Sequence, residues 1–161
     1  ILGCVIEKAS NMSFGNYLKK NIFEPLQMED TFFKVPEAKR SRMTNLYAHH
    51  NAFKAFDVDI PKELKGKKPK MYLIDSSRDS LFYKNITIED GGSGLVSTAS
   101  DYSNFAQMLL YKGVYKGKRI LSDDSFNTLV SDQLNEKNSR FRGFGMGITL
   151  GIALDLSLIH I

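Results

Sequence analysis

Residues 98–113 carry the strongest structural signal in the chain. Thr98 and Asp101 form a capping-box pair, in which the Thr98 hydroxyl accepts from the Asp101 N–H at the positive end of a helix. Apolar residues then recur at the spacing of one helical face, and Gly113 ends the pattern. These apolar residues are Tyr102, Phe105, Ala106, Leu109 and Leu110. The segment predicts an amphipathic helix that buries this face.

Three other segments show the same helical spacing of apolar residues. The first begins at Ile1 with no capping residue before it, so we expect the chain to be cut from something longer. The second has Ser13 as its predicted N-cap and stops at Pro25. Ser122 caps the third, with acidic residues in its first turn.

The patterns between and after these helices are weaker. The lysine-rich residues 61–80 predict a loop, and residues 81–88 predict a strand because Ile86 and Ile88 alternate around a threonine. Residues 143–154 are apolar, glycine-punctuated and free of charge, as a buried strand would be.

Composition excludes several classes of protein. A length of 161 residues suits one domain, and 42% hydrophobic with 25% charged residues is typical of a globular chain. The net charge of +4 is mostly local, with five lysines in residues 62–70, and no nucleic-acid motif accompanies it. No apolar run of about eighteen residues predicts a membrane span. The single Cys4 excludes an internal disulfide framework and a cysteine-built zinc site.

Familiar catalytic motifs are not found. His49 and His50 are adjacent, so their side chains point different ways and make a poor metal clamp; we expect a solvated turn. Residues 91–94 approach G-x-S-x-G, but Leu95 stands where the last glycine is required. They also fail the phosphate-loop and dinucleotide patterns. On physical grounds they predict a tight turn of close backbone approach, with Gly92 as a position where a side chain would strain it.

Two blocks of sequence match one known pattern in order and spacing. The first includes residues 1–8 (ILGCVIEK) and 22–31 (IFEPLQMEDT). The second is residues 91–102 (GGSGLVSTASDY), which are similar to G-G-x-G-L-x-S-T-x-x-D-[YFM]. Together they resemble the serine β-lactamase-related family, which includes class C β-lactamases, D-alanyl-D-alanine carboxypeptidases, D-aminopeptidases and related esterases. Residues 35–85 are the unmatched middle.

The resemblance implies an α+β fold, a partial β-lactamase/DD-peptidase-like fold in which a helical region packs against part of an antiparallel sheet. Residues 1–155 are then a fragment of one such domain. Residues 156–161 follow Asp155 without a turn or a cap, and we interpret them as a non-native tail.

In that family a serine in S-x-x-K attacks a carbonyl, a tyrosine in Y-x-N exchanges protons, and a K-[ST]-G or H-x-G strand helps to stabilise the oxyanion. Residues 1–161 contain no S-x-x-K, K-[ST]-G or H-x-G. The resemblance places the first two motifs before Ile1 and the third beyond Asp155, so no catalytic residue is assigned inside the chain. Residues 102–104 spell Y-x-N, but Tyr102 fits the apolar stripe and is predicted to be core.

The resemblance does assign a substrate-binding turn, formed by Gly91, Gly92, Ser93 and Gly94, whose Ser93 can line the acyl-group side. The alternative is that these glycines only satisfy a turn before the helix. Glu89 and Asp90 either act on a basic group of the substrate or are solvated loop acids.

The leading hypothesis is a fragment of a serine hydrolase that transfers an acyl group from an amide or ester (β-lactam, D-amino peptide or ester) through an acyl-enzyme. The partner is then a small-molecule or peptide-like substrate, with no cofactor, metal or nucleic acid. The resemblance favours the cell envelope, periplasmic or secreted, and leaves the oligomeric state open. A catalytically silent relative used as a binding scaffold is the alternative. A third hypothesis, a small helical interaction domain, predicts that residues 1–155 fold alone.

Overall fold

The computed structural model describes residues 1–49, 71–92 and 94–131. The chain divides into two compact units. Unit 1 comprises Ile1–Gly15 and Asp30–Ser97, and unit 2 comprises Asn16–Glu29 and Thr98–Ile161. Several predictions fall outside the described residues: those for His50, for the lysines of 62–70, for Ser93, for the strand over 143–154 and for the tail.

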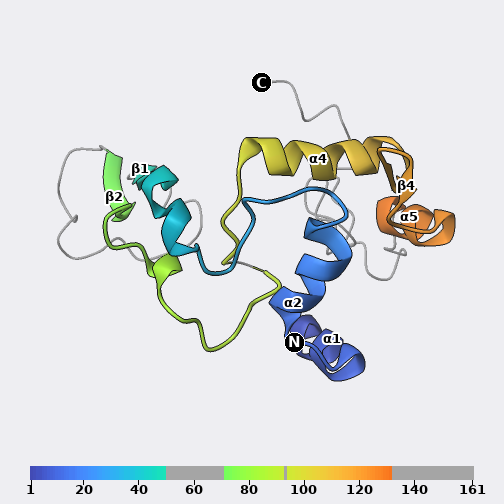
Figure 1. The fold of residues 1–161 in the computed structure, drawn as a ribbon, viewed down its shortest axis with the longest axis horizontal. Coiled ribbons are helices and arrows are strands. Elements are labelled where there is room, and N and C mark those ends of the chain that lie inside the picture. The colour runs from blue at the N-terminus through green and yellow to red at the C-terminus, as the bar shows by residue number, and fades with distance from the viewer. Residues whose placement is uncertain (50–70, 93, 132–161) are drawn as a thin grey trace, which may run out of the picture. The chain divides into compact units, whose positions relative to one another are not determined.

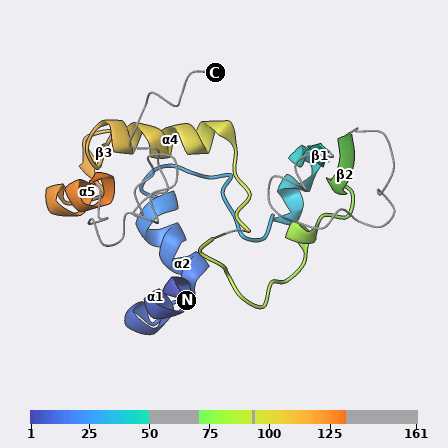
Figure 2. The same cartoon turned by 180° about the vertical axis from the view of Figure 1, so that it is seen from behind.

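The described part of unit 1 combines one helix, two 3₁₀ turns and a two-stranded sheet. In chain order these are α1 (Leu2–Ser10), η2 (Glu37–Arg42), β1 (Leu46–His49), β2 (Met71–Asp75) and η4 (Leu81–Tyr83). β1 and β2 are antiparallel, with Tyr47 opposite Leu73 and an irregularity between Leu46 and Tyr47, and the two views of the ribbon show them side by side (Figures 1 and 2). The predicted first helix is confirmed by α1.

Two predictions in the middle of the chain are wrong. Met71–Asp75 lies in the predicted loop but forms β2, and Leu81–Tyr83 lies in the predicted strand but forms a 3₁₀ turn. β2 forms because β1 pairs with it. The 3₁₀ turn begins at the fully buried Ser80, whose hydroxyl accepts from the Phe82 N–H at 3.2 Å and donates to the Asp75 carboxylate. This local cap bends the chain directly after β2 and overrides the β propensity of the residues that follow.

Unit 2 contains the elements that the sequence predicts best. The short helix α2 (Phe14–Leu18) starts in unit 1 and continues into the π-helical turn η1 (Lys19–Phe23), which ends two residues before Pro25. The later elements are α4 (Ala99–Leu110), β3 (Val114–Tyr115), β4 (Lys118–Arg119) and α5 (Asp123–Val130). Both predicted caps of the later helices are confirmed: Thr98 accepts from the Asp101 N–H and Ser122 from the Ser125 N–H.

The apolar core of unit 2 is formed by residues from three segments. Its buried members are Phe23, Leu26, Met28, Met108 and Tyr115. On α4 the buried line runs through Asp101 and Met108, whereas Tyr102 is 65% exposed. The prediction that Tyr102 is core is therefore wrong. The buried face of α4 is offset by about one residue from the apolar stripe that the sequence predicts.

Candidate functional site

Two glycines of the predicted glycine turn (residues 91–94), Gly91 and Gly94, lie near two aromatic rings of unit 1, which we call the aromatic floor. A Cβ atom built on Gly91 would be 3.7 Å from the ring of Phe14, and one built on Gly94 would be 3.7 Å from the ring of Phe33. The two rings are both buried, with centroids 5.8 Å apart and planes tilted by 47°. A side chain at Gly91 or Gly94 would therefore begin at ordinary van der Waals contact with one of these rings.

The backbone conformation of Gly94 favours glycine. Its φ is +93°, a conformation that residues with a side chain rarely adopt. Gly92 is not among the positions of positive φ, and the nearest group to its missing side chain is the Asp90 carboxylate at 3.5 Å. The strained position is therefore Gly94 and not Gly92, which corrects the sequence prediction.

The downstream end of the glycine turn is paired with residues 31–33. The Val96 N–H donates to the Phe32 carbonyl at 2.8 Å, and the Phe32 N–H donates to the Val96 carbonyl at 2.9 Å. The hydroxyls of Thr31 and Ser97 share a hydrogen bond of 2.8 Å. These contacts fix the exit of the turn without any substrate.

The partner segment is itself fixed by an ion-pair cluster. The Asp30 carboxylate is 2.7 Å from Lys39 Nζ and 2.7 Å from the Arg42 guanidinium, both on η2. Their hydrogen bonds, first that of Lys39 and then that of Arg42, hold the pKa of the Asp30 carboxyl below its usual value.

The upstream end is held by the two acidic residues whose role the sequence left open. The half-buried Glu89 carboxylate accepts from the Gly15 N–H, and Asp90 Oδ1 accepts from the Gly92 N–H at 3.2 Å. Glu89 is therefore not a solvated loop acid. Sequence reasoning missed the role of Glu89 and the aromatic floor, since their partners are distant in sequence and no local pattern marks them.

The other candidate residues lie apart from this turn. His49 is exposed at the end of β1, and Cys4 is exposed on α1. The described ranges hold no cluster of three or more His, Cys, Asp or Glu residues that could bind a metal ion. Among the helices described, none is long and apolar enough to cross a membrane.

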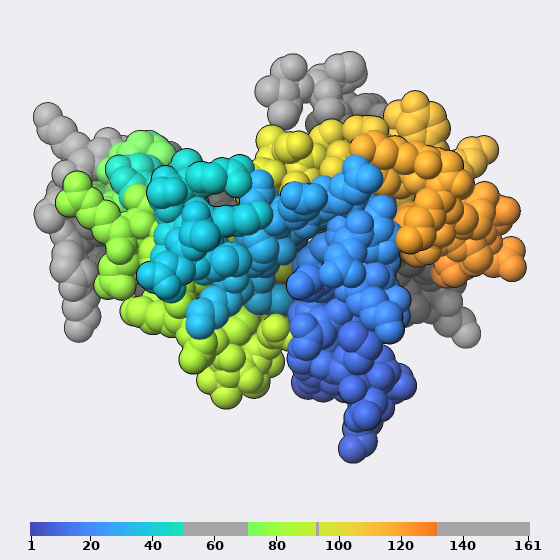
Figure 3. All heavy atoms as spheres, in the orientation of Figure 1, coloured from blue at the N-terminus to red at the C-terminus, as the bar shows by residue number. Residues whose placement is uncertain are grey.

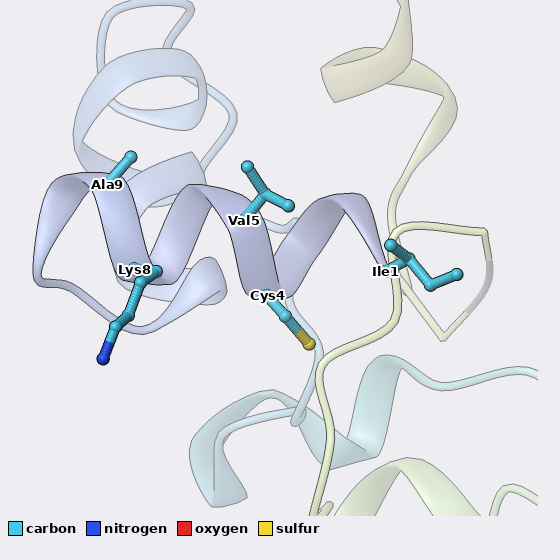
Figure 4. Close-up of a pocket in the computed structure, with 5 residues that line it drawn as sticks. All are labelled: Ile1, Cys4, Val5, Lys8 and Ala9. Atoms are coloured by element: carbon cyan, nitrogen blue, oxygen red, sulfur yellow. The ribbon is translucent and has the colours of Figure 1, made fainter.

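One face of α1 borders a shallow apolar depression. Its lining residues are Ile1, Cys4, Val5, Lys8 and Ala9 (Figure 4). Figure 4 shows Cys4 and Lys8 pointing to one side of the helix and Val5 and Ala9 to the other, and the space-filling view shows α1, in dark blue, at the surface (Figure 3). The lining contains no carboxylate or histidine that could act as a general base, so we assign no catalytic role to this depression.

Comparison with known proteins decides the family. The model of the β-lactamase family matches residues 1–157. The chain belongs to the β-lactamase family. Protein Rv1367c of Mycobacterium tuberculosis is 25% identical over 162 residues, a match that covers 99% of this chain and 36% of that protein. The chain thus spans little more than a third of the curated relatives it matches first.

Two solved structures share the fold. Unliganded simvastatin synthase (LovD) from Aspergillus terreus superposes with a TM-score of 0.61 at 19% identity, over 86% of this chain and 29% of LovD. The octameric penicillin-binding protein homologue from Pyrococcus abyssi gives 0.52 at 20% identity, over 81% of this chain and 23% of that one. The predicted α+β, partial β-lactamase-like fold is confirmed. The family is one of serine hydrolases, which work by acyl transfer.

Proposed function

We propose that the protein containing this chain transfers the acyl group of an amide or ester through a serine acyl-enzyme, and that the glycine turn lines the acyl side of its substrate site. The observation that supports this proposal is the construction of the turn. Gly91 and Gly94 lie near two buried rings, those of Phe14 and Phe33, and both ends of the turn are tied to other segments of unit 1. A turn without bulky side chains, held in this way, offers a substrate a preformed wall.

The chemistry itself requires groups that we assign outside residues 1–161. A serine hydroxyl is a weak nucleophile near neutral pH, so a positioned base must take its proton and preorganised donors must stabilise the oxyanion. We assign S-x-x-K and Y-x-N to the chain before Ile1 and the third motif to the chain beyond Asp155. Residues 1–155 then form part of one domain, with residues 156–161 as a non-native tail.

The substrate class follows from the same assignment. A β-lactam, a D-amino peptide and a simple ester all present a carbonyl to the nucleophile and an acyl side to the glycine turn. No cofactor or metal enters this mechanism. We propose a small-molecule or peptide-like substrate and leave the three classes to experiment.

The test compares this chain with the full-length protein. Each is incubated with a chromogenic cephalosporin and a short-chain nitrophenyl ester, and the protein mass is measured for a covalent acyl adduct. We expect an adduct on the full-length protein and none on residues 1–161. Turnover by the chain alone that survives Ser93→Ala and Ser97→Ala and exceeds a mock preparation would contradict the proposal. Binding of either compound without an adduct would favour the catalytically silent scaffold.

A further inference from the structure

Glu89 and Gly15 form a contact that joins the glycine turn to the start of α2. The Glu89 carboxylate accepts from the Gly15 N–H, across 74 positions of sequence. The same carboxylate fills the space where a side chain at residue 15 would stand, since a Cβ atom there would collide with the carboxylate carbon and with Oε1. With the carboxylate in this position, residue 15 has no room for a side chain, and residue 89 must offer an acceptor at the end of its side chain.

The start of α2 is bound by two carboxylates in succession. Glu7 Oε1, on α1, accepts from the Phe14 N–H at 2.9 Å, and Glu89 accepts from the next N–H along the chain. The first N–H groups of a helix have no partner within the helix, and their partial positive charge favours carboxylates. The short helix thus has both of these donors satisfied by side chains from other segments.

The same contact sets the entry to the glycine turn. Gly91 follows Glu89 by two residues, and a Cβ atom built on it would be 3.7 Å from the ring of Phe14, which is the neighbour of Gly15. The Glu89 carbonyl lies 3.4 Å from the position of a Cβ on Gly3, so the backbone of residue 89 is close to α1 as well. Carboxylate, carbonyl and ring fix the path of the chain on its way into the turn.

We propose that Glu89 is a positioning residue for substrate binding: by holding the Gly15 amide, it sets where the glycine turn stands. The inference rests on the proposed function, because it assumes that the turn meets the acyl side of the substrate. Glu89 touches no reacting atom in this scheme. Its loss weakens substrate binding more than it slows the chemical step.

The first test uses steady-state kinetics of the full-length protein with the nitrophenyl ester. We expect Glu89→Ala to raise KM about tenfold, which corresponds to the loss of roughly one charge-assisted hydrogen bond, and to change kcat by less than about threefold. Glu89→Gln keeps an acceptor of the same length, so it restores KM to within about threefold of wild type. The control is Glu24→Ala, which removes an exposed carboxylate of unit 2 and leaves both constants unchanged.

The second test is a double-mutant cycle. Gly15→Ala expels the Glu89 carboxylate, so it raises KM by the same factor as Glu89→Ala, and the double variant is no worse than either single one. Factors that multiply in the double variant would overturn the contact. An unchanged KM in a folded Glu89→Ala enzyme would overturn the positioning role.

The third test is independent of activity. Amide hydrogen exchange at Gly15, followed by nuclear magnetic resonance, is expected to be at least about tenfold faster in Glu89→Ala than in wild type because the amide loses its acceptor. Unchanged exchange would overturn the inference by itself. A wild-type protein that neither forms an acyl-enzyme nor binds the ester would instead overturn the proposed function, while the exchange experiment would still report the contact.

Discussion

The two units of this chain are stabilised in different ways. Unit 2 is built on apolar packing, with Leu26 and Met108 almost completely buried at the centre of its core. Unit 1 holds its glycine turn with polar contacts: a carboxylate on a backbone amide, a short strand bridge and a cluster of ion pairs. In the described part of unit 1, the buried hydrophobic side chains are the two rings beneath the turn, Phe14 and Phe33, together with Val35.

This difference agrees with the roles we propose, a scaffold for unit 2 and a substrate-binding turn for unit 1. Apolar packing is non-directional and strong, and it suits a scaffold whose exact backbone position is not critical to a ligand. Hydrogen bonds are directional and individually worth less, about 1 kcal/mol each, but they fix a backbone segment at one place. We therefore expect substitutions to be costlier for stability in unit 2 and costlier for function in unit 1.

The largest expected effect lies in unit 2. Leu26 is 0% exposed, so Leu26→Ala should destabilise the chain by about 2–5 kcal/mol through lost burial and the cavity left behind. Urea unfolding measures the loss, and hydrogen exchange on peptides from each unit locates it. The matched control is Leu110→Ala on α4, where the side chain is 75% exposed and the change should stay within about 0.5 kcal/mol. Equal losses at the two leucines would contradict the assignment of Leu26 to a tightly packed core in unit 2.

A smaller effect is expected at the glycine turn of unit 1. Gly94→Ala forces a side chain onto a φ of +93° and should cost about 1–2 kcal/mol. Gly92→Ala, without that conformation, should stay within about 0.5 kcal/mol. Urea unfolding of the two variants compares them directly. If Gly92→Ala proved the more damaging, the strain would have to be reassigned to the position that the sequence favoured.

The sequence predicts the elements of unit 2 better than the contacts of unit 1. In unit 2 the signals are local: Thr98 and Asp101 are three residues apart, and so are Ser122 and Ser125, so helix starts could be predicted correctly. In unit 1 the deciding contacts are distant. β2 forms because β1 is available to pair with it, and Glu89 finds its partner 74 residues earlier. No pattern within a short window contains such information.

Tyr102 marks a limit of another kind. Its helix was predicted with the right start, yet the apolar stripe pointed to the wrong face by about one residue, since Met108 is buried and Tyr102 is exposed. Periodicity states that a helix has an apolar side, whereas the packing partner selects which part of that side is covered. For the candidate site, the glycine turn could be predicted from the sequence. The contacts that hold it, those of Glu89 with Gly15 and of Phe32 with Val96, could not be predicted.

The smallest expected effect concerns the ion pairs of Asp30, which is 20% exposed at its side chain. Because Lys39 and then Arg42 lower the pKa of its carboxyl in the folded state, Asp30 stabilises the fold fully at a pH above its unfolded value, about 3.9. This contribution is lost as the pH falls through the lower, folded pKa, where the carboxyl is protonated in both states.

Asp30→Asn should therefore cost roughly 1 kcal/mol near neutral pH, and the difference from wild type should fade as the pH falls below about 4. Urea unfolding of both proteins across this range measures the difference. Glu37→Gln, an exposed carboxylate on the same 3₁₀ turn, is the control and should show little effect at any pH. A cost at Asp30 that persisted unchanged at acidic pH would mean that the carboxyl contributes by shape and not by charge. The contacts of Asp30 with Lys39 and Arg42 would then stabilise unit 1 whether or not the Asp30 carboxyl is protonated.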